Sequence, residues 1–345
     1  MHAGVSPLAE LMACLHVLAE PDHHPEARGW LQRTGAALPD PLRSDLHRFV
    51  PLWARYRSRL FFPTDERLNR TLTEELVSLA ALPDDQFLPL AADAIRGRVT
   101  GLDDAAAVAA GGVWVRECEN RSFARGDLAH ALVRNPDAFR RDLLDLLGRC
   151  ATAFFTSDWE RARPVLDAAS RAVSHKLSTE PVLDVIAGLT DAASTRGSAD
   201  TVYIDKLQQA ECIVEETGLL LIPSIRARPH LIVKADPTVP KIVHYPTRAA
   251  GETSRPTQDD MRRRLLVLSE PIRWELCRHL INESITTTEL ATRTGASKSA
   301  VSRHLRALRE TQLVESQKEG RQVFHRLNAA VILSLGADSL EAIIR

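Results

Sequence analysis

The sequence predicts a mainly α-helical protein with two domains. The N-terminal domain, residues 1–245, is expected to be helical with a small β meander near 219–245. The C-terminal domain, residues 261–345, is expected to hold short helices and a β-hairpin. Two observations predict this division. Apolar residues repeat at helical spacing before the β-rich pieces, and residues 246–260, a polar stretch with Gly and Pro, have the composition of a linker.

Length and composition favour a folded protein of the cytoplasm. The 345 residues are 44% hydrophobic and 26% charged, which permits packed cores and disfavours a wholly disordered chain. The sequence has no apolar run of the roughly 18–20 residues that span a bilayer and no signal peptide at its start, so we expect no membrane partner. Five cysteines, an odd number without a CxxC pair, disfavour a disulfide framework or a zinc ribbon.

Helices of the first domain are predicted from apolar stripes and from proline positions. The clearest is expected after Pro63, with Thr64 or Asp65 as N-cap. Its stripe consists of Leu68, Leu72, Leu76 and Leu79. Another helix is expected from Pro136, and Pro164 is placed near the start of a further one, where proline is tolerated.

Residues 219–245 change character. Three short pieces rich in β-forming residues, 219–223, 230–234 and 241–245, are separated by prolines and polar residues. We expect them to form a small antiparallel meander or a set of edge strands that closes the first domain.

The second domain begins with a basic amphipathic segment from Met261 to Leu268, followed by a helix from Pro271. Thr286 and Glu289 have the spacing of a capping box at the start of a short helix. Gly295 permits the left-handed turn that ends this helix after Thr294. Ser297 can cap the next helix, roughly 297–310. Two helices joined by a short turn containing Gly form a helix-turn-helix arrangement.

Residues 297–310 have two distinct faces on a helical wheel. Val301, Leu305 and Leu308 fall on one side at 100° per residue, and we expect that side to pack on the preceding helices. Small hydroxyl residues near the N-terminus and cations further on occupy the rest. Such a helix suits insertion into a DNA major groove, where Ser and Arg contact base edges or phosphates.

A hairpin is predicted directly after this helix. Leu313–Ser316 and Val323–Leu327 are strand-like, and Lys318, Gly320 and Arg321 lie at the tip between them. A cationic hairpin after a recognition helix is the wing of a winged helix-turn-helix. The charge distribution agrees, since residues 261–345 carry 14 Lys and Arg against 9 Asp and Glu, and residues 1–260 carry 30 against 36.

The stretch ITTTELATRTGASKSAVSRHLRALRETQLVESQKEGRQVFHRL resembles the winged-helix domain of the ArsR/SmtB repressor family. The preceding part, with GLLLIPSI and KIVHYPTR, resembles the long-form ArsR-like regulators that carry a helical domain ahead of the winged helix. The resemblance implies a homodimeric DNA-binding protein, usually a repressor released by a signal. It also implies that the dimer contact uses the terminal helices, 261–269 and 330–344, and we expect part of the first domain to contribute.

Metal sites are not expected. The positions at which metal-sensing relatives of this family place cysteine or histidine ligands read TTELATRTG and AAVILSLGADSLEAIIR here, without Cys or His. In Asp22-His23-His24-Pro25-Glu26, adjacent histidines cannot easily share one metal ion, and the segment is typical of a helix start. We therefore expect no metal and no cofactor.

The function predicted is that of a sequence-specific transcriptional regulator that acts as a homodimeric repressor. Its expected partners are double-stranded DNA with a palindromic operator and a second copy of the chain. The N-terminal domain is expected to sense a small-molecule effector or to extend the dimer. The expected DNA-binding residues are Ser297, Lys298, Ser299, Ser302, Arg303, Arg306, Lys318 and Arg321. The alternatives are an enzyme or a protein-interaction domain fused to a winged-helix module. The enzyme alternative lacks support, because no nucleophile, metal-protease or nucleotide-binding motif occurs.

Overall fold

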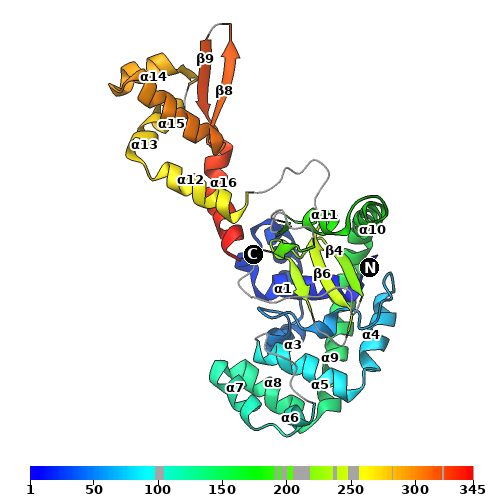
Figure 1. Cartoon of the computed structure of the whole chain (residues 1–345). Helices are drawn as coiled ribbons and strands as arrows, with labels where there is room; N and C mark the ends of the chain where they lie inside the picture. Colours follow the sequence, from blue (N-terminus) through cyan, green and yellow to red (C-terminus); the bar gives the residue numbers. More distant parts are fainter. Residues whose placement is uncertain are drawn as a thin grey trace. The chain divides into compact units, whose positions relative to one another are not determined.

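The computed structural model describes residues 1–97, 105–190, 193–195, 200–204, 218–235, 239–247, 256–281, 283–320 and 322–344 (Figure 1). Contacts between residues divide the chain into two compact units, Met1–Glu252 and Thr253–Arg345. Within the described residues, no helix combines the length and the apolar character needed to cross a bilayer.

The N-terminal unit is mainly helical, as predicted. Its α-helices are α1 (Pro7–Ala19), α2 (Arg28–Ala37), α3 (Asp40–Phe49), α4 (Leu72–Ala80), α5 (Asp84–Arg96), α6 (Ala105–Ala109), α7 (Val113–Arg121), α8 (Phe123–Arg134), α9 (Pro136–Cys150), α10 (Thr156–Thr179) and α11 (Val182–Ala187). A π-helical turn, Ala151–Phe155, joins α9 to α10, and short 3-10 turns connect several of the others.

The helix predicted after Pro63 begins later than expected, at Leu72. Thr71 is its N-cap: the hydroxyl accepts a hydrogen bond from the Glu74 N–H at 3.3 Å, and the Glu74 carboxylate accepts one from the Thr71 N–H at 2.7 Å. Asp65, an expected cap, instead pairs with two nearby arginines. The predicted start is wrong because a reciprocal capping box satisfies two backbone N–H groups, whereas a lone Thr or Asp satisfies one.

The helix predicted from Pro136 is confirmed as α9, with Asn135 as its cap. Pro164, however, lies inside α10 and not near a helix start. Proline removes one hydrogen bond to the carbonyl four residues earlier. Here both Pro164 and Glu160, which carries that carbonyl, are exposed, so water can reach the group and the helix continues.

The three β-rich pieces of the N-terminal unit form strands, but their pairing differs from a meander. The sheet has the order β1 (His2–Ala3), β4 (Leu219–Ser224), β6 (Lys241–Pro246), β5 (Ile232–Lys234). β4 pairs in parallel with β6, and only β5 is antiparallel to its neighbour. The antiparallel prediction is wrong because β4 and β6 are buried along nearly their whole length, and continuous apolar runs are typical of parallel strands covered on both faces. A separate pair, β2 (Ala193–Ser194) and β3 (Tyr203–Ile204), is antiparallel.

Helices cover both faces of this sheet. Successive side chains of a strand point to opposite faces. Leu220 and Ile222 of β4 join the large helical core that contains α1, whereas Leu219 and Leu221 pack with residues of α10 and α11. The sheet therefore lies between two apolar layers, and β4 and β6 are its interior strands.

Large aromatic residues of the N-terminal unit belong to its core. Trp30, Trp53, Phe61, Phe62 and Trp114 are buried members of the main hydrophobic cluster. These aromatic rings therefore contribute to packing of the N-terminal unit.

The C-terminal unit has the helices and the strand wing that the sequence predicts (Figure 1). Its elements are α12 (Gln258–Leu268), α13 (Pro271–Leu280), β7 (Ile285–Thr286), α14 (Thr287–Thr294), α15 (Lys298–Glu310), β8 (Val314–Glu319), β9 (Gln322–Leu327) and α16 (Ala329–Ile344). The strands form one antiparallel sheet in the order β7-β9-β8. A compact core formed by α13, α14, α15 and the sheet holds the unit together.

Regular structure extends into both ends of the predicted linker, 246–260. Pro246 is the last residue of β6. At the other end α12 begins at Gln258, because Thr257 and Asp260 form a complete capping box there. Residues 248–255 lie outside the described part of the chain.

Candidate nucleic-acid interface

Helices α14 and α15 are joined by a three-residue turn that begins at Gly295, whose φ of 66° lies in the left-handed region. The hydroxyl of Thr286 caps α14 by accepting a hydrogen bond from the Glu289 N–H at 3.3 Å. The other half of the predicted capping box is wrong, because the Glu289 carboxylate accepts a hydrogen bond from Nε of Arg293, at 2.8 Å. The helix-turn-helix arrangement itself is confirmed.

The apolar side of α15 is fixed against the rest of the unit. Val301, Leu305 and Leu308 are buried and belong to the core that includes Leu276 and Leu290 of the two preceding helices. A fully buried aliphatic side chain stabilises the folded state by about 1.5–3 kcal/mol. These contacts therefore hold the helix rigidly by one side and determine which residues face solvent.

The predicted DNA-reading residues of α15 all lie on its exposed side. They are Ser297, Lys298, Ser299, Ser302, Arg303 and Arg306. Ser297 is also the N-cap, since its Oγ accepts a hydrogen bond from the Ala300 N–H at 3.2 Å. Small residues at the N-terminal end of α15 permit close approach of a DNA backbone. Free N–H groups at the N-terminus of a helix also attract phosphate. The contact of these residues with DNA stays a prediction.

The two arginines of this face differ in what they contact. Nε of Arg306 donates to the Glu310 carboxylate at 2.8 Å, an exposed i,i+4 ion pair. Within the described residues, the side chain of Arg303 forms neither an ion pair nor a hydrogen bond, so its five N–H donors are available to a ligand. Arg303 is therefore the better candidate for a bidentate contact with a base.

The wing is formed by β8 and β9. Lys318 is exposed near the tip, where Glu319 pairs with Gln322 and Gly320 has a φ of 59°. The left-handed conformation of Gly320 explains why glycine is needed at this turn. Arg321, the other cation predicted at the tip, lies outside the described residues.

A buried arginine, Arg264, connects α15 to the two terminal helices of the unit. Its Nη2 donates to Oε1 of Gln312 at 2.8 Å, and its Nε donates to the Thr311 carbonyl at 3.2 Å, both just after α15. Its Nη1 lies 3.7 Å from the carboxylate of Asp338 in α16. Arg264 therefore fixes the end of the recognition helix relative to α12 and α16.

A buried histidine, His325, connects the two strands of the wing to α14. His325 of β9 lies 2.7 Å from the hydroxyl of Ser316 on β8 and 3.0 Å from that of Thr287 on α14. Burial lowers the pKa of His325, with the positive charge of Arg309 as a second cause, so the ring is neutral near pH 7. His304, which the sequence places beside the apolar stripe, accepts a hydrogen bond from Arg273 at 3.4 Å.

Sequence reasoning missed two features of this interface. The basic segment predicted for 261–268 contains the exposed Arg262 and Arg263, but Arg264 within it is buried. The spacing of Met261, Arg264 and Leu268 is that of the inner face of a helix. Arg326 on β9 adds an exposed cation to the wing, outside the hairpin tip on which the prediction concentrated.

Comparisons with protein families divide the chain near the same place as its contacts do. Residues 1–251 match a family described as "Family of unknown function (DUF5937)", and residues 268–317 match one described as "Helix-turn-helix domain". No functionally curated protein matches the chain. The predicted helix-turn-helix regulator with an additional N-terminal domain is confirmed by these matches, and the structure shows the predicted strand wing.

Solved structures match about a quarter of the chain. An ArsR-like transcriptional regulator from Rhodococcus sp. RHA1 is 34% identical over 25% of this chain and 79% of its own length, with a TM-score of 0.23. Reduced HlyU from Vibrio cholerae is 27% identical over 23% of this chain and 88% of its own, with a TM-score of 0.20. NolR from Sinorhizobium fredii is 28% identical over 23% of this chain and 80% of its own length, with a TM-score of 0.21.

Proposed function

The chain belongs to DUF5937, a family of unknown function, and we propose that this member is a homodimeric repressor that reads a palindromic operator with α15 and responds to a small-molecule signal through its N-terminal unit. The helix-turn-helix domain makes it a DNA-binding transcriptional regulator. The observation that carries the proposal is the two-sided character of α15, which is anchored by Val301, Leu305 and Leu308 and exposes hydroxyl groups and cations on the opposite side.

Exposed apolar residues on the terminal helices support the proposed dimer. α16 is an apolar helix without a fully buried residue, and Leu333 and Ile343 on it are 85% and 75% exposed. Leu265 and Leu266 of α12, which packs against α16, are also more than half exposed. Burying this surface against a second copy would remove it from water, and a twofold dimer would present two α15 helices to half-sites about 34–36 Å apart.

The size of the N-terminal unit supports a regulatory role for it. Residues Met1–Glu252 form a unit with its own helical core and sheet, far larger than DNA reading requires. For a signal to release the operator, its binding free energy must differ between the DNA-competent and DNA-incompetent arrangements of the dimer.

An affinity titration with Arg303→Ala tests the role of α15. Genomic fragments retained by the purified full-length chain are sequenced first, and one enriched fragment serves as the probe in a fluorescence anisotropy titration. Loss of a bidentate base contact costs about 1–3 kcal/mol, so Kd for this fragment should rise about 5- to 150-fold. Binding to unrelated DNA should change much less, because phosphate contacts dominate it.

The matched control is Arg309→Ala, which removes the same charge from the flank of the same helix. We expect it to weaken specific and non-specific binding to a similar small extent. If Arg303→Ala leaves the affinity for the enriched fragment unchanged, or if both variants act alike, the assigned reading face is refuted.

A further inference from the structure

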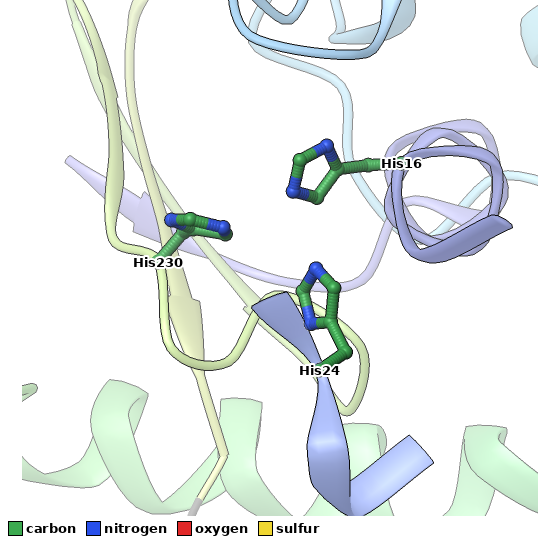
Figure 2. Close-up of side chains that lie close together, drawn as sticks. All are labelled: His16, His24 and His230. Atoms are coloured by element: carbon green, nitrogen blue, oxygen red, sulfur yellow. The ribbon is translucent and has the colours of Figure 1, made fainter. Parts of the chain in front are cut away.

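Three histidines from distant parts of the N-terminal unit meet in its interior. His16 lies on α1, His24 follows the 3-10 turn Pro21–His23, and His230 lies in the connection from β4 to β5. One ring nitrogen from each lies within 4.8 Å of the other two, and the residues are only 3%, 1% and 4% exposed. Figure 2 shows the three imidazoles gathered around a common space and approaching it from different elements.

The chemistry of His24 points to a ligand in this space. Among the described residues, neither ring nitrogen of His24 has a hydrogen-bond partner, although the side chain is buried. A buried polar group without a partner destabilises the folded state, and such a group in a native protein calls for an explanation. Nδ1 of His24 lies 3.6 Å from the Glu26 carboxylate, which leaves Nε2 as the atom available to a ligand.

His16 has the orientation of a metal ligand. Its Nδ1 lies 3.0 Å from the Trp53 carbonyl, to which an Nδ1–H can donate, and its Nε2 then carries the lone pair. A backbone carbonyl or carboxylate on the far nitrogen is the usual outer partner of a metal-bound histidine.

We propose that His16, His24 and His230 bind one divalent transition-metal ion, with zinc as the best fit. Three imidazole ligands without a thiolate or a direct carboxylate ligand suit Zn²⁺, Co²⁺, Ni²⁺ or Cu²⁺, and do not suit Ca²⁺ or Mg²⁺. Zn–N bonds of about 2.0–2.1 Å in a tetrahedral site require nitrogens about 3.3 Å apart, so the rings would move together by up to roughly 1.5 Å.

His23 lies beside the cluster but is not among its three ligands, which are His16, His24 and His230. Its ring centroid lies 5.9 Å from that of His230 and 6.3 Å from that of His16, and its Nδ1 is buried without a hydrogen-bond partner among the described residues. Three protein ligands leave the fourth position of a tetrahedral zinc ion open to a water molecule.

Arg57 competes with a metal ion for His16. Its Nη2 contacts Nε2 of His16, the atom that would bind the metal. A guanidinium is charged at neutral pH and repels a divalent cation. Metal binding must therefore displace the side chain of Arg57 from His16.

A cobalt titration of the untagged, chelator-treated full-length chain tests the site at pH 7. We expect one Co²⁺ per chain, with visible d–d bands typical of nitrogen ligands and displacement of Co²⁺ by Zn²⁺. His24→Gln and His230→Gln should each weaken binding by more than the roughly 10- to 100-fold that outer-shell changes cost. His47→Gln, which replaces an exposed histidine of the same unit, should bind like the unmodified chain.

A second variant keeps the test independent of misfolding. Arg57→Gln removes the competing cation, so Co²⁺ affinity should rise, by about tenfold or more, a gain that a damaged fold would not produce. The proposal is overturned if the unmodified chain binds no Co²⁺ at equimolar concentration or if a thiolate charge-transfer band shows cysteine ligands. Retention of full affinity in both histidine variants, or no gain in Arg57→Gln, would overturn it as well. None of these results depends on DNA binding.

Discussion

Arg264→Met separates the charge of Arg264 from the apolar length of its side chain. In the structure this side chain and that of Asp338 are only 8% and 12% exposed, so the variant would leave a carboxylate nearly buried without its cation. It would also remove the donors to Thr311 and Gln312 at the end of α15. Methionine keeps most of the packing of the aliphatic stem.

The expected cost follows from these contacts. Removing one partner of a buried ion pair costs about 3–5 kcal/mol. Asp338 keeps a hydrogen bond from the Ser334 hydroxyl at 2.7 Å and is not completely enclosed, so the lower end applies. A cost of about 3 kcal/mol raises the equilibrium constant for local opening about 150-fold, at 1.4 kcal/mol for each factor of ten.

Hydrogen exchange followed by mass spectrometry measures this effect in the full-length chain, because peptides covering Leu305–Leu313 report on the C-terminal unit alone. Exchange there should accelerate by the same factor, about 150-fold, and DNA affinity should fall with it. Arg263→Met is the control, since Arg263 is 67% exposed and its ion pair with Asp260 is worth about 0–1 kcal/mol.

Two results would refute this reasoning. The first is equal exchange rates in the two variants. The second comes from the double variant Arg264→Met/Asp338→Leu, which removes both charges and should recover most of the lost stability. If the double variant opens as readily as Arg264→Met alone, the ion pair is not the cause.

Three further predictions concern charge, acid and assembly. Glu310→Gln removes the acid that pairs with Arg306, so affinity for any DNA duplex should rise severalfold at low salt, and an unchanged anisotropy titration would contradict this. Burial, with the charge of Arg57 as a second cause, lowers the pKa of His244 from 6.5 to about 3, so the folded state loses about 1.4 kcal/mol per pH unit from this group as the pH falls below 6.5. His244→Phe should abolish that loss, which denaturant titrations at pH 7 and pH 5 can detect by tryptophan fluorescence, and an unaltered pH dependence would exclude the assignment. Leu333→Asp should weaken the proposed dimer about 100-fold in Kd, from about 1.5 kcal/mol in each copy, by analytical ultracentrifugation, whereas Val77→Asp, at another exposed apolar residue, should not.

The recognition helix was predictable because its signals are local. Val301, Leu305 and Leu308 repeat at helical spacing, Ser297 provides a cap, and Gly295 allows the turn that precedes it. Each of these signals acts within a few residues of the chain. The fold could therefore be inferred there without knowledge of distant contacts.

Strand pairing and the histidine cluster depend on contacts that sequence spacing does not reveal. The runs in β4 and β6 predict strands, but the parallel pairing of β4 with β6 depends on helices that cover both faces. The sequence argument considered His23 and His24 as neighbours, whereas the fold brings His16 and His230 to His24 from far along the chain. A histidine within the otherwise apolar run of α1 was the one available signal, and it identifies no partner.

The apolar side chains of α16 are exposed in the single chain, and this has a consequence for gene control. In the proposed dimer, chains pair by mass action, so at low abundance the share of occupied operators rises with the square of the number of chains per cell. Halving synthesis of the protein would then lower the share of occupied operators about fourfold in that range. The number of gene copies that encode the regulator would therefore influence the expression of its target genes.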